Sequence, residues 1–459
     1  MAQPGYAYLT LAAARTELAA RLEDPSYVFW TAQELNDILA NAVRCWQALT
    51  GTFKQRATFT ISPGGGVDGS SFYDLNSQLG VLSFALTDLQ IVDMILAALL
   101  EPPLTFDWVG TGQFHFRQIT DSLQNRINRW MGDTGANVTR NIQDVGTGPT
   151  AARIFLPDGV MDVRRAAWLN AAGEYSTLWR DDQLAMQAFR FGGNLTPVDP
   201  PVVWGRFTIP PVGLEVYPPP ANPGQIETLV VEQGPQIGPS PSAIVADPTV
   251  LHIPEDFVWG MVFGALSDLC SADGPMRDLD RAQYAESRYQ ESVELYKLNP
   301  TLIDSLINGQ QVWTGSVFEM DSFLASWQAQ PGEPRFCGMA GRNLVAFGPT
   351  PSSTYSVTMD VVGNIPLPTA DGDFLQVDRG AINPLLDYAQ HLASWKMAGT
   401  EFHNTDKLRQ NFYVQAALEN SRITQSNFYR TALQLPAFRQ QQEVPRMGAP
   451  NEQAQGVKI

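Results

Sequence analysis

The feature that most constrains this fold is a recurring order of β-type segments followed by pairs of capped helices. The order occurs three times, with β-type runs near residues 56–75, 151–231 and 344–362. Alternating apolar and polar residues indicate strands, and apolar residues spaced by three and four indicate helices with one buried face. The pattern predicts an α+β protein in which helix pairs alternate with small antiparallel β-sheets or hairpins.

The helix signals are sharpest in the segment "TAQELNDILANAVRCWQAL", residues 31–49. Thr31 caps the first turn and Glu34 completes a capping box, while Thr10 and Thr87 begin two other helices in the same way. Trp46 lies on the apolar face. We expect Trp46→Ala either to cost about 3–5 kcal/mol as a core void or, if Trp46 lies between subunits, to prevent subunit assembly without changing the melting temperature.

The second and third β-plus-helix passes resemble one another at an offset of about 130 residues. "VGLEVYPPPANPGQIETLVVEQ" matches "RNLVAFGPTPSSTYSVTMDVVG" in pattern, and "HIPEDFVWGMVFGALSDL" matches "AINPLLDYAQHLASWKMA". "LWRDDQLAMQAF" likewise resembles "VFEMDSFLASWQ". We interpret this order of hairpin, Pro-rich connector and helix pair as an internal duplication.

The predicted organisation has four parts: residues 1–150, a helical module with a β-hairpin; 151–300, a β-sheet plus helix pair; 301–435, a second, repeat-like module; and 436–459, an extended tail. The tail is polar and broken by proline, so it has no apolar face on which to fold alone. We expect a neighbouring subunit or partner to order it.

Bulk composition excludes several classes of protein. The net charge of −17 argues against an open nucleic-acid-binding surface and fits either simple solubility or a channel wall past which DNA slides. Cys45, Cys270 and Cys337 are predicted to be reduced, buried thiols. The start "MAQPGYAYLT" is unlike a signal peptide, and the apolar run Ile91–Leu100 is too short to cross a membrane.

Candidate ligand-binding residues are sparse. His391 and His403 flank a helix end near Glu401, but no two-histidine helix motif is present, so we interpret them as ordinary surface or helix-hairpin histidines. The Gly64–Gly66 run lacks the strand-to-helix context and Lys-Ser/Thr of a phosphate loop, and we predict a turn. We expect no catalytic, cofactor-binding or metal-binding residues.

Two carboxylate pairs, Asp181–Asp182 and Asp371 with Asp373, contain the groups that glycoside cleavage requires. Both pairs occur where aspartate is favoured for capping or turn formation, which is the interpretation we prefer.

A basic group comprises Arg117, Arg126, Arg129 and Arg140, with Trp130 among them. Such a group could stack a nucleic acid. Because the rest of the chain is acidic, we favour a helix face that meets an acidic partner surface.

The N-terminal run "LTLAAARTELAARLEDPSYVFWTAQELNDILANAVRCWQALTG" resembles the start of head-to-tail connector (adaptor or neck) proteins of tailed bacteriophages. In these proteins a first helix, an aromatic-Thr step and a capped helix follow in this order. "LHIPEDFVWGMVFGALSDL" with "RAQYAESRYQESV" is similar to their recurring Ile-Pro step and helix pair. The chain is longer than simple adaptors, and its extra copies are not part of their pattern.

The resemblance implies a non-enzymatic structural subunit of the virion without cofactors. Its expected partners are copies of itself in a ring of about a dozen, the portal protein, and downstream tail, nozzle or fibre proteins. Genomic DNA would pass through during ejection without specific binding, and assembly would occur in the cytoplasm of the host bacterium. The alternative is a carbohydrate-directed tail protein that binds or hydrolyses glycans.

Overall fold

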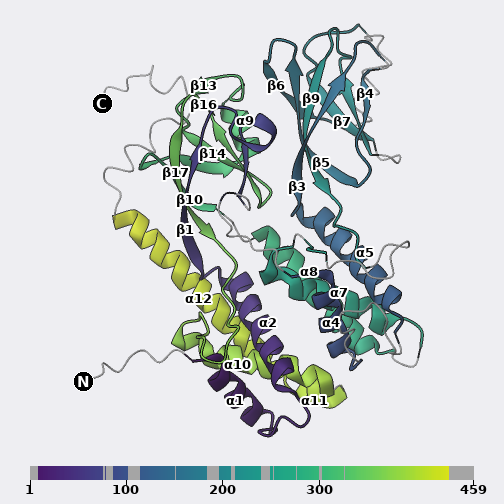
Figure 1. Cartoon of the computed structure of the whole chain (residues 1–459), viewed down its shortest axis with the longest axis vertical. Coiled ribbons are helices and arrows are strands. Elements are labelled where there is room, and N and C mark those ends of the chain that lie inside the picture. The colour runs from purple at the N-terminus through teal and green to yellow at the C-terminus, as the bar shows by residue number, and fades with distance from the viewer. Residues whose placement is uncertain are drawn as a thin grey trace, which may run out of the picture.

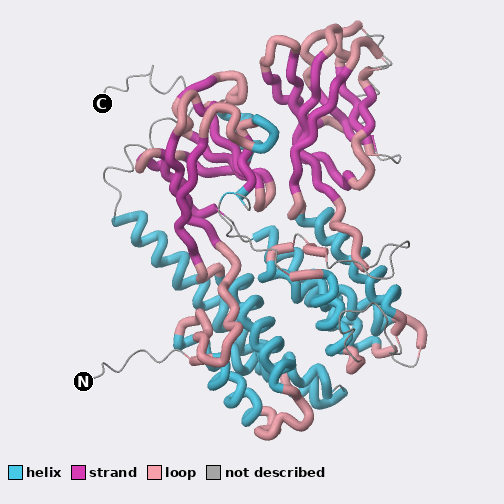
Figure 2. Tube along the Cα trace, viewed as in Figure 1, coloured by secondary structure: helices cyan, strands magenta, loops and turns pink. Residues whose placement is uncertain are grey.

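The computed structural model describes the following residues: 9–75, 78, 86–101, 114–149, 151–182, 196–207, 212–238, 249–251, 253–274, 277–298, 302–324, 326–397 and 399–433. The chain is an α+β protein, as predicted. It forms two units, each with a bundle of helices at one end and a β-structure at the other, and the two units point in the same direction (Figures 1 and 2).

Unit 1 is built from both ends of the chain. Its N-terminal elements are α1 (Leu11–Arg21), α2 (Ala32–Thr50), β1 (Lys54–Ile61), the 3-10 turn η1 (Val67–Gly69) and β2 (Phe72–Asp74). Its later strands are β10 (Leu302–Ile307), β11 (Gln310–Gln311), β12 (Trp313–Ser316), β13 (Pro331–Gly332), β14 (Phe336–Ala340), β15 (Leu344–Gly348), β16 (Thr350–Pro351) and β17 (Tyr355–Val362). Its later helices are α9 (Val317–Phe323), α10 (Arg379–Ser394), η3 (Trp395–Met397), α11 (Gly399–Asn404) and α12 (Asp406–Leu433).

Unit 2 is continuous in sequence and is inserted between β2 and β10 of unit 1. Its helices are α4 (Asp88–Ala98), α5 (Phe116–Thr134), η2 (Glu255–Phe257), α7 (Val258–Ser271) and α8 (Leu279–Leu298). Its strands are β3 (Val138–Val145), β4 (Arg153–Phe155), β5 (Val160–Asn170), β6 (Tyr175–Arg180), β7 (Val203–Phe207), β8 (Gly213–Tyr217) and β9 (Gly224–Glu232).

The two β-structures have the same strand order. Unit 2 has one seven-stranded sheet in the order β3-β9-β5-β6-β7-β8-β4. Unit 1 has two four-stranded sheets, β1-β17-β10-β11 and β12-β14-β15-β2, and β11 and β12 are separated by one residue, Val312. Both β6–β7 and β12–β14 are parallel, whereas the other neighbours in these sheets are antiparallel. The units therefore share a topology as well as a composition of elements.

Strand registers match in detail between the units. The pairing of β5 with β9 shifts between Val163 and Arg165, and that of β10 with β17 shifts between Leu302 and Asp304. Each shift lies at the corresponding place in the strand order. The strands β8 and β15 are each followed directly by a cis X-Pro bond. The predicted offset of about 130 residues therefore aligns structurally equivalent strands.

The helices preceding each sheet also correspond. Helices α2 and α5 each span 19 residues, begin with a capping box and end at a glycine in the left-handed region. Trp46 and Trp130 occupy the same position in these helices, and their carbonyls accept hydrogen bonds from the Thr50 and Thr134 hydroxyls. The duplication predicted from the sequence covered only the second and third β-plus-helix segments. It did not include this correspondence between the first and second segments, although both tryptophans and both threonines stand in the sequence.

The predicted small hairpins are wrong. The runs around Gly64–Gly66 form β1 and β2, but β1 pairs along its whole length with β17, and β2 pairs with β15. The sheets are larger than expected and contain parallel pairs. The reason is that each strand finds its partner in a distant segment, which local patterning does not reveal. Strand pairing connects the predicted module of residues 1–150 with the predicted module of residues 301–435. The exact module boundaries remain predictions from the sequence.

Helix starts agree with the capping signals in most cases. Thr10, Thr31 and Thr87 cap α1, α2 and α4. The start expected at Asn383-Pro384 is wrong, because α10 begins at Arg379 and contains Pro384. The proline lies in the second turn, where its missing N–H removes only one intrahelical bond.

A continuous apolar core joins the two bundles. Trp46 is 2% exposed and packs on Phe412 of α12, so it belongs to the core of the chain. The buried side of α4 faces α5 and α7 of the same chain. The three cysteines are buried and unpaired, as predicted. None of the helices that the structure describes is both long and apolar enough to cross a membrane.

Candidate functional site

The densest cluster of buried charge lies where the β-structures of the two units meet. Arg165 of β5 in unit 2 donates to both carboxylate oxygens of Asp321 in α9 of unit 1, at 2.6 and 2.9 Å. It also donates to Glu227 of β9 at 3.2 Å and to Gln328 at 2.8 Å. The Arg165 side chain is 2% exposed, so this cluster ties the units together without water.

Glu227 is the centre of the cluster on the side of unit 2. Its side chain is fully buried, and Arg140 of β3 donates to it at 2.7 Å. Burial alone would lower the pKa of Arg165, but the Asp321 and Glu227 carboxylates more than compensate, so its pKa is raised. A buried ion cluster of this kind adds little net stability, but removing one member leaves an uncompensated charge.

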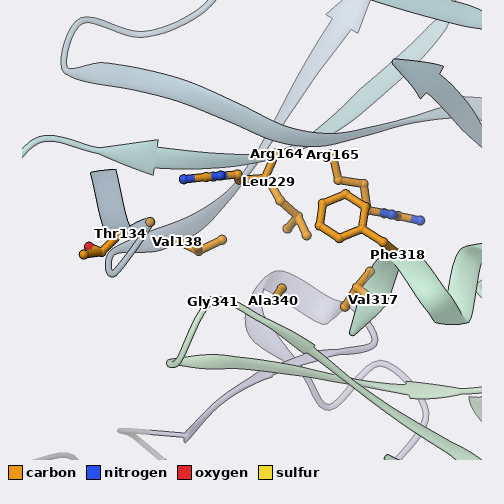
Figure 3. Close-up of a pocket in the computed structure, with 10 residues that line it drawn as sticks. Thr134, Val138, Arg164, Arg165, Leu229, Val317, Phe318, Ala340 and Gly341 are labelled. Atoms are coloured by element: carbon orange, nitrogen blue, oxygen red, sulfur yellow. The ribbon is translucent and has the colours of Figure 1, made fainter. Parts of the chain in front are cut away.

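A small pocket of about 170 Å³ opens beside this cluster (Figure 3). Unit 2 contributes Arg164 and Arg165, whose guanidinium groups point to different sides, and unit 1 contributes Phe318. Its other lining residues are small or apolar: Thr134, Gly135, Val138, Leu229, Val317, Ala340 and Gly341. Among these described lining residues there is no carboxylate, histidine or cysteine, the side chains that most often act in acid–base catalysis.

A second buried centre joins the helix bundles. Arg288 of α8 is 1% exposed, donates to the Tyr388 hydroxyl of α10 at 2.5 Å and forms an ion pair with Glu291. Its guanidinium carbon lies 4.4 Å from the centre of the Trp259 ring, and the amino group that donates to Tyr388 is also 3.3 Å from the Cys45 sulfur in α2. Arg288 therefore links unit 2 to both α2 and α10 of unit 1.

A third centre contains Asp256, at the start of the α7 helix pair. Burial raises the pKa of its carboxyl to about 8, although the Ile365 amide and the charges of Arg342 and Arg44 oppose this rise. Arg342 in turn lies 4.7 Å from the centre of the Tyr296 ring. These groups lie where η2 of unit 2 contacts unit 1, and burial in this contact is the cause of the raised pKa of Asp256.

The candidate histidines do not form a metal site. His391 is 1% exposed, and its ring nitrogens lie 2.9 Å from the hydroxyls of Tyr284 and Thr405. Burial, reinforced by the charges of Arg409 and Arg288, lowers its pKa to about 3. Of the two interpretations offered, His391 fits that of a residue buried between helices, whereas His403 is exposed at the end of α11. The Glu401 side chain lies outside the described part of the chain, and no group of three or more potential ligands within that part could hold a metal ion.

The carboxylate pairs have local structural roles. Asp181 accepts a hydrogen bond from the amide of Asp182 at 2.8 Å, just after β6. Asp371 forms an ion pair with Arg15 at 2.8 Å, and Asp373 accepts the amides of Thr369 and Ala370. The Gly64–Gly66 run forms a turn, in which the Gly65 amide donates to the Ser62 carbonyl.

The basic group does not converge on one surface. Arg126 is paired with Asp268 and Glu286 of α7 and α8, so the acidic partner of this helix face lies within the chain. Arg140 is buried against Glu227, and Trp130 is fully buried. Arg129 is 55% exposed beside Asp133, and Arg117 is exposed at the start of α5.

Sequence reasoning missed the residues that join the units. Arg165 and Glu227 lie in the β-type runs "VMDVRRAAWL" and "QIETLVVE". A charge on the apolar side of a strand was the available signal, but its partner Asp321 is about 150 residues away. No protein-family model and no curated protein sequence matches this chain.

Proposed function

We propose that this protein is a structural subunit of a bacteriophage head-to-tail connector or tail ring, which docks on the portal, surrounds the DNA channel and carries tail components. The observation that supports this most is the arrangement of two like units side by side and pointing the same way (Figure 1). Repetition of one module about an axis is how ring proteins are built. The N-terminal resemblance to connector proteins points to the same role.

We infer that the two units arose by internal duplication of one helix–sheet–helix module. Shared strand order, matching register shifts and the paired Trp46 and Trp130 support this inference. The second copy then lies within the first instead of after it. A duplicated module enlarges a wall or platform without adding a new fold.

The roles of the polar residues support a non-enzymatic function. The described candidate residues form caps, turns and ion pairs, and the three buried centres join elements of the two units. The charge of −17 also suits a subunit that surrounds DNA, because a wall with an excess of carboxylates repels phosphates. Such a subunit would belong to the virion and assemble in the host cytoplasm.

The test is the native mass of the purified chain, measured by light scattering alone and with the portal protein of the same phage. A defined ring, formed alone or only on the portal, supports the proposal. A chain that stays monomeric in both conditions and binds neither portal nor tail protein overturns it.

The alternative, a carbohydrate-directed tail protein, has a separate test. Binding or cleavage of host polysaccharide that is lost in Asp181→Asn or Asp182→Asn would favour it over the ring. Because Asp181 holds the Asp182 amide at the end of β6, each variant also needs an unchanged melting temperature before a loss is assigned to chemistry.

A further inference from the structure

The contact between the two units uses different surfaces on each side. Unit 1 contributes α9 and the turn between β14 and β15, through residues such as Asp321, Val317 and Gly341. Unit 2 contributes the sheet face of β3, β5 and β9, through Arg165 and Leu229. A contact of this kind is heterologous, and the same contact can therefore be repeated by further copies.

Unit 1 has its own version of the sheet face that unit 2 uses. The matched registers place Arg56 of β1 where unit 2 has Arg140, and Asp304 of β10 where unit 2 has Arg165. Arg56 is 62% exposed and forms two 2.7 Å hydrogen bonds with Asp360, next to Thr58. The face that is covered in unit 2 is therefore open in unit 1.

The helix bundles show the same difference. In unit 2 the last helix, α8, carries Tyr284 and Arg288, which contact α10 of unit 1 through His391 and Tyr388. In unit 1 the last helix is α12. Its outer side exposes Val414 and Leu418, at 56% and 58%, one helical turn apart. Within the described part of the chain, the apolar side chains of Val414 and Leu418 therefore remain exposed to solvent.

These two open surfaces lie on the same side of unit 1. Figure 1 places β1, β10, β17 and α12 on the side of unit 1 that faces away from unit 2. In unit 2, β3, β5 and α8 lie on the side that faces unit 1. We propose that unit 2 of a second copy of this chain docks on the β1/β10/β17 and α12 face of unit 1 and thereby repeats the contact made within the chain.

The two versions of this face carry opposite charge at one matched position. Within the chain, Asp321 of α9 forms an ion pair with Arg165 of unit 2. At the open face of unit 1, the position of Arg165 is held by Asp304.

This inference rests on the proposed ring and specifies how it is made. Because each chain supplies two units, about six chains would present about a dozen similar units to a twelve-fold portal. The ring would then have half the number of chains that the connector resemblance alone implies.

The experiment measures the native mass of the full-length chain, alone and with portal, for wild type and two variants. The double variant Val414→Glu/Leu418→Glu and the single variant Thr58→Arg each place charge on the open face. We expect both to reduce the assembly to single chains while circular dichroism and melting temperature stay unchanged.

A matched control is Val28→Glu, since Val28 is 85% exposed on the loop between α1 and α2, away from the open face. It should assemble like wild type. If the open-face variants also form rings, or if the control loses assembly with them, the proposed interface is wrong although the connector role stands. If wild type never assembles, with or without portal, the connector role itself fails.

Discussion

Units 1 and 2 share one architecture but differ in how the chain builds them. Unit 2 closes its sheet by pairing β3 with β9 inside one continuous segment, whereas unit 1 pairs β1 with β17 across the whole of unit 2. Because loop-closure entropy grows only with the logarithm of loop length, this insertion costs unit 1 roughly 1 kcal/mol. A complete module can therefore interrupt another without preventing its closure.

Equivalent positions in the two units also differ in exposure. Arg140 of unit 2 is buried against Glu227, whereas Arg56, at the matching register of unit 1, is exposed and pairs with Asp360. The same backbone thus supports a dry ion pair in one copy and a solvated pair in the other. The difference comes from what packs on the sheet, and four measurements test it.

The largest expected effect is in the helices that correspond most closely. Trp46→Ala and Trp130→Ala should each lower the free energy of unfolding by about 3–5 kcal/mol, because each leaves a void in the shared core. Chemical denaturation of the unassembled chain measures both. If Trp46→Ala left stability unchanged and only prevented assembly, its placement against Phe412 would be wrong.

The ion pairs test the difference between the units directly. Arg140→Ala should cost about 3–5 kcal/mol because it leaves Glu227 buried with one cation fewer. Arg56→Ala in the unassembled chain should cost at most about 1 kcal/mol, since its pair is exposed. Equal losses in the two variants, measured by urea denaturation, would contradict the burial difference.

The His391–Tyr284 contact joins the bundles and should make stability depend on pH. The pKa of His391 is about 3 in the folded chain and 6.5 ordinarily, so the unfolded chain binds the proton more readily between these values. Stability from this group is complete above pH 6.5 and falls as the pH is lowered. Between pH 7 and pH 5 the loss should be on the order of 2 kcal/mol.

The control for this pH effect is His391→Gln. Asp256, whose pKa of about 8 makes stability fall as the pH rises above its ordinary value, is present in both proteins and cancels in the difference. The difference in unfolding free energy between wild type and variant should therefore shrink from pH 7 to pH 5. A difference that stays constant would show that His391 is not buried in its neutral form.

The smallest expected effect concerns equivalent helix caps. Thr10 and Thr87 cap α1 and α4, and each also forms an isolated antiparallel bridge, to Phe374 and Val250 respectively. Thr10→Ala and Thr87→Ala should each cost about 1 kcal/mol. Thermal unfolding would show unequal costs if the two units differ at this position.

Comparison of sequence and structure separates local from distant interactions. The caps at Thr10, Thr31 and Thr87 could be predicted because the donor and acceptor lie within three residues of each other. The resemblance between the β8 and β15 regions was also visible, since equivalent strands keep their order along the chain. The Trp46–Trp130 match needed only a comparison of the first and second passes.

The buried centres could not be predicted in the same way. Arg165 looks like any charged strand residue until Asp321 is brought against it, and Arg288 looks like a solvated helix residue until Tyr388 covers it. Whether such a charge is solvated or desolvated depends on the partner surface and not on its neighbours in sequence.

The amino-acid sequence by itself determined the helices, their caps, the strand-forming runs and the acidic charge, because those properties depend on composition or on residues a few positions apart. The pairing of the strands, the insertion of one unit within the other and the burial of particular arginines follow from the tertiary structure. Those outcomes depend on contacts between segments hundreds of residues apart, where packing and desolvation outweigh local preference.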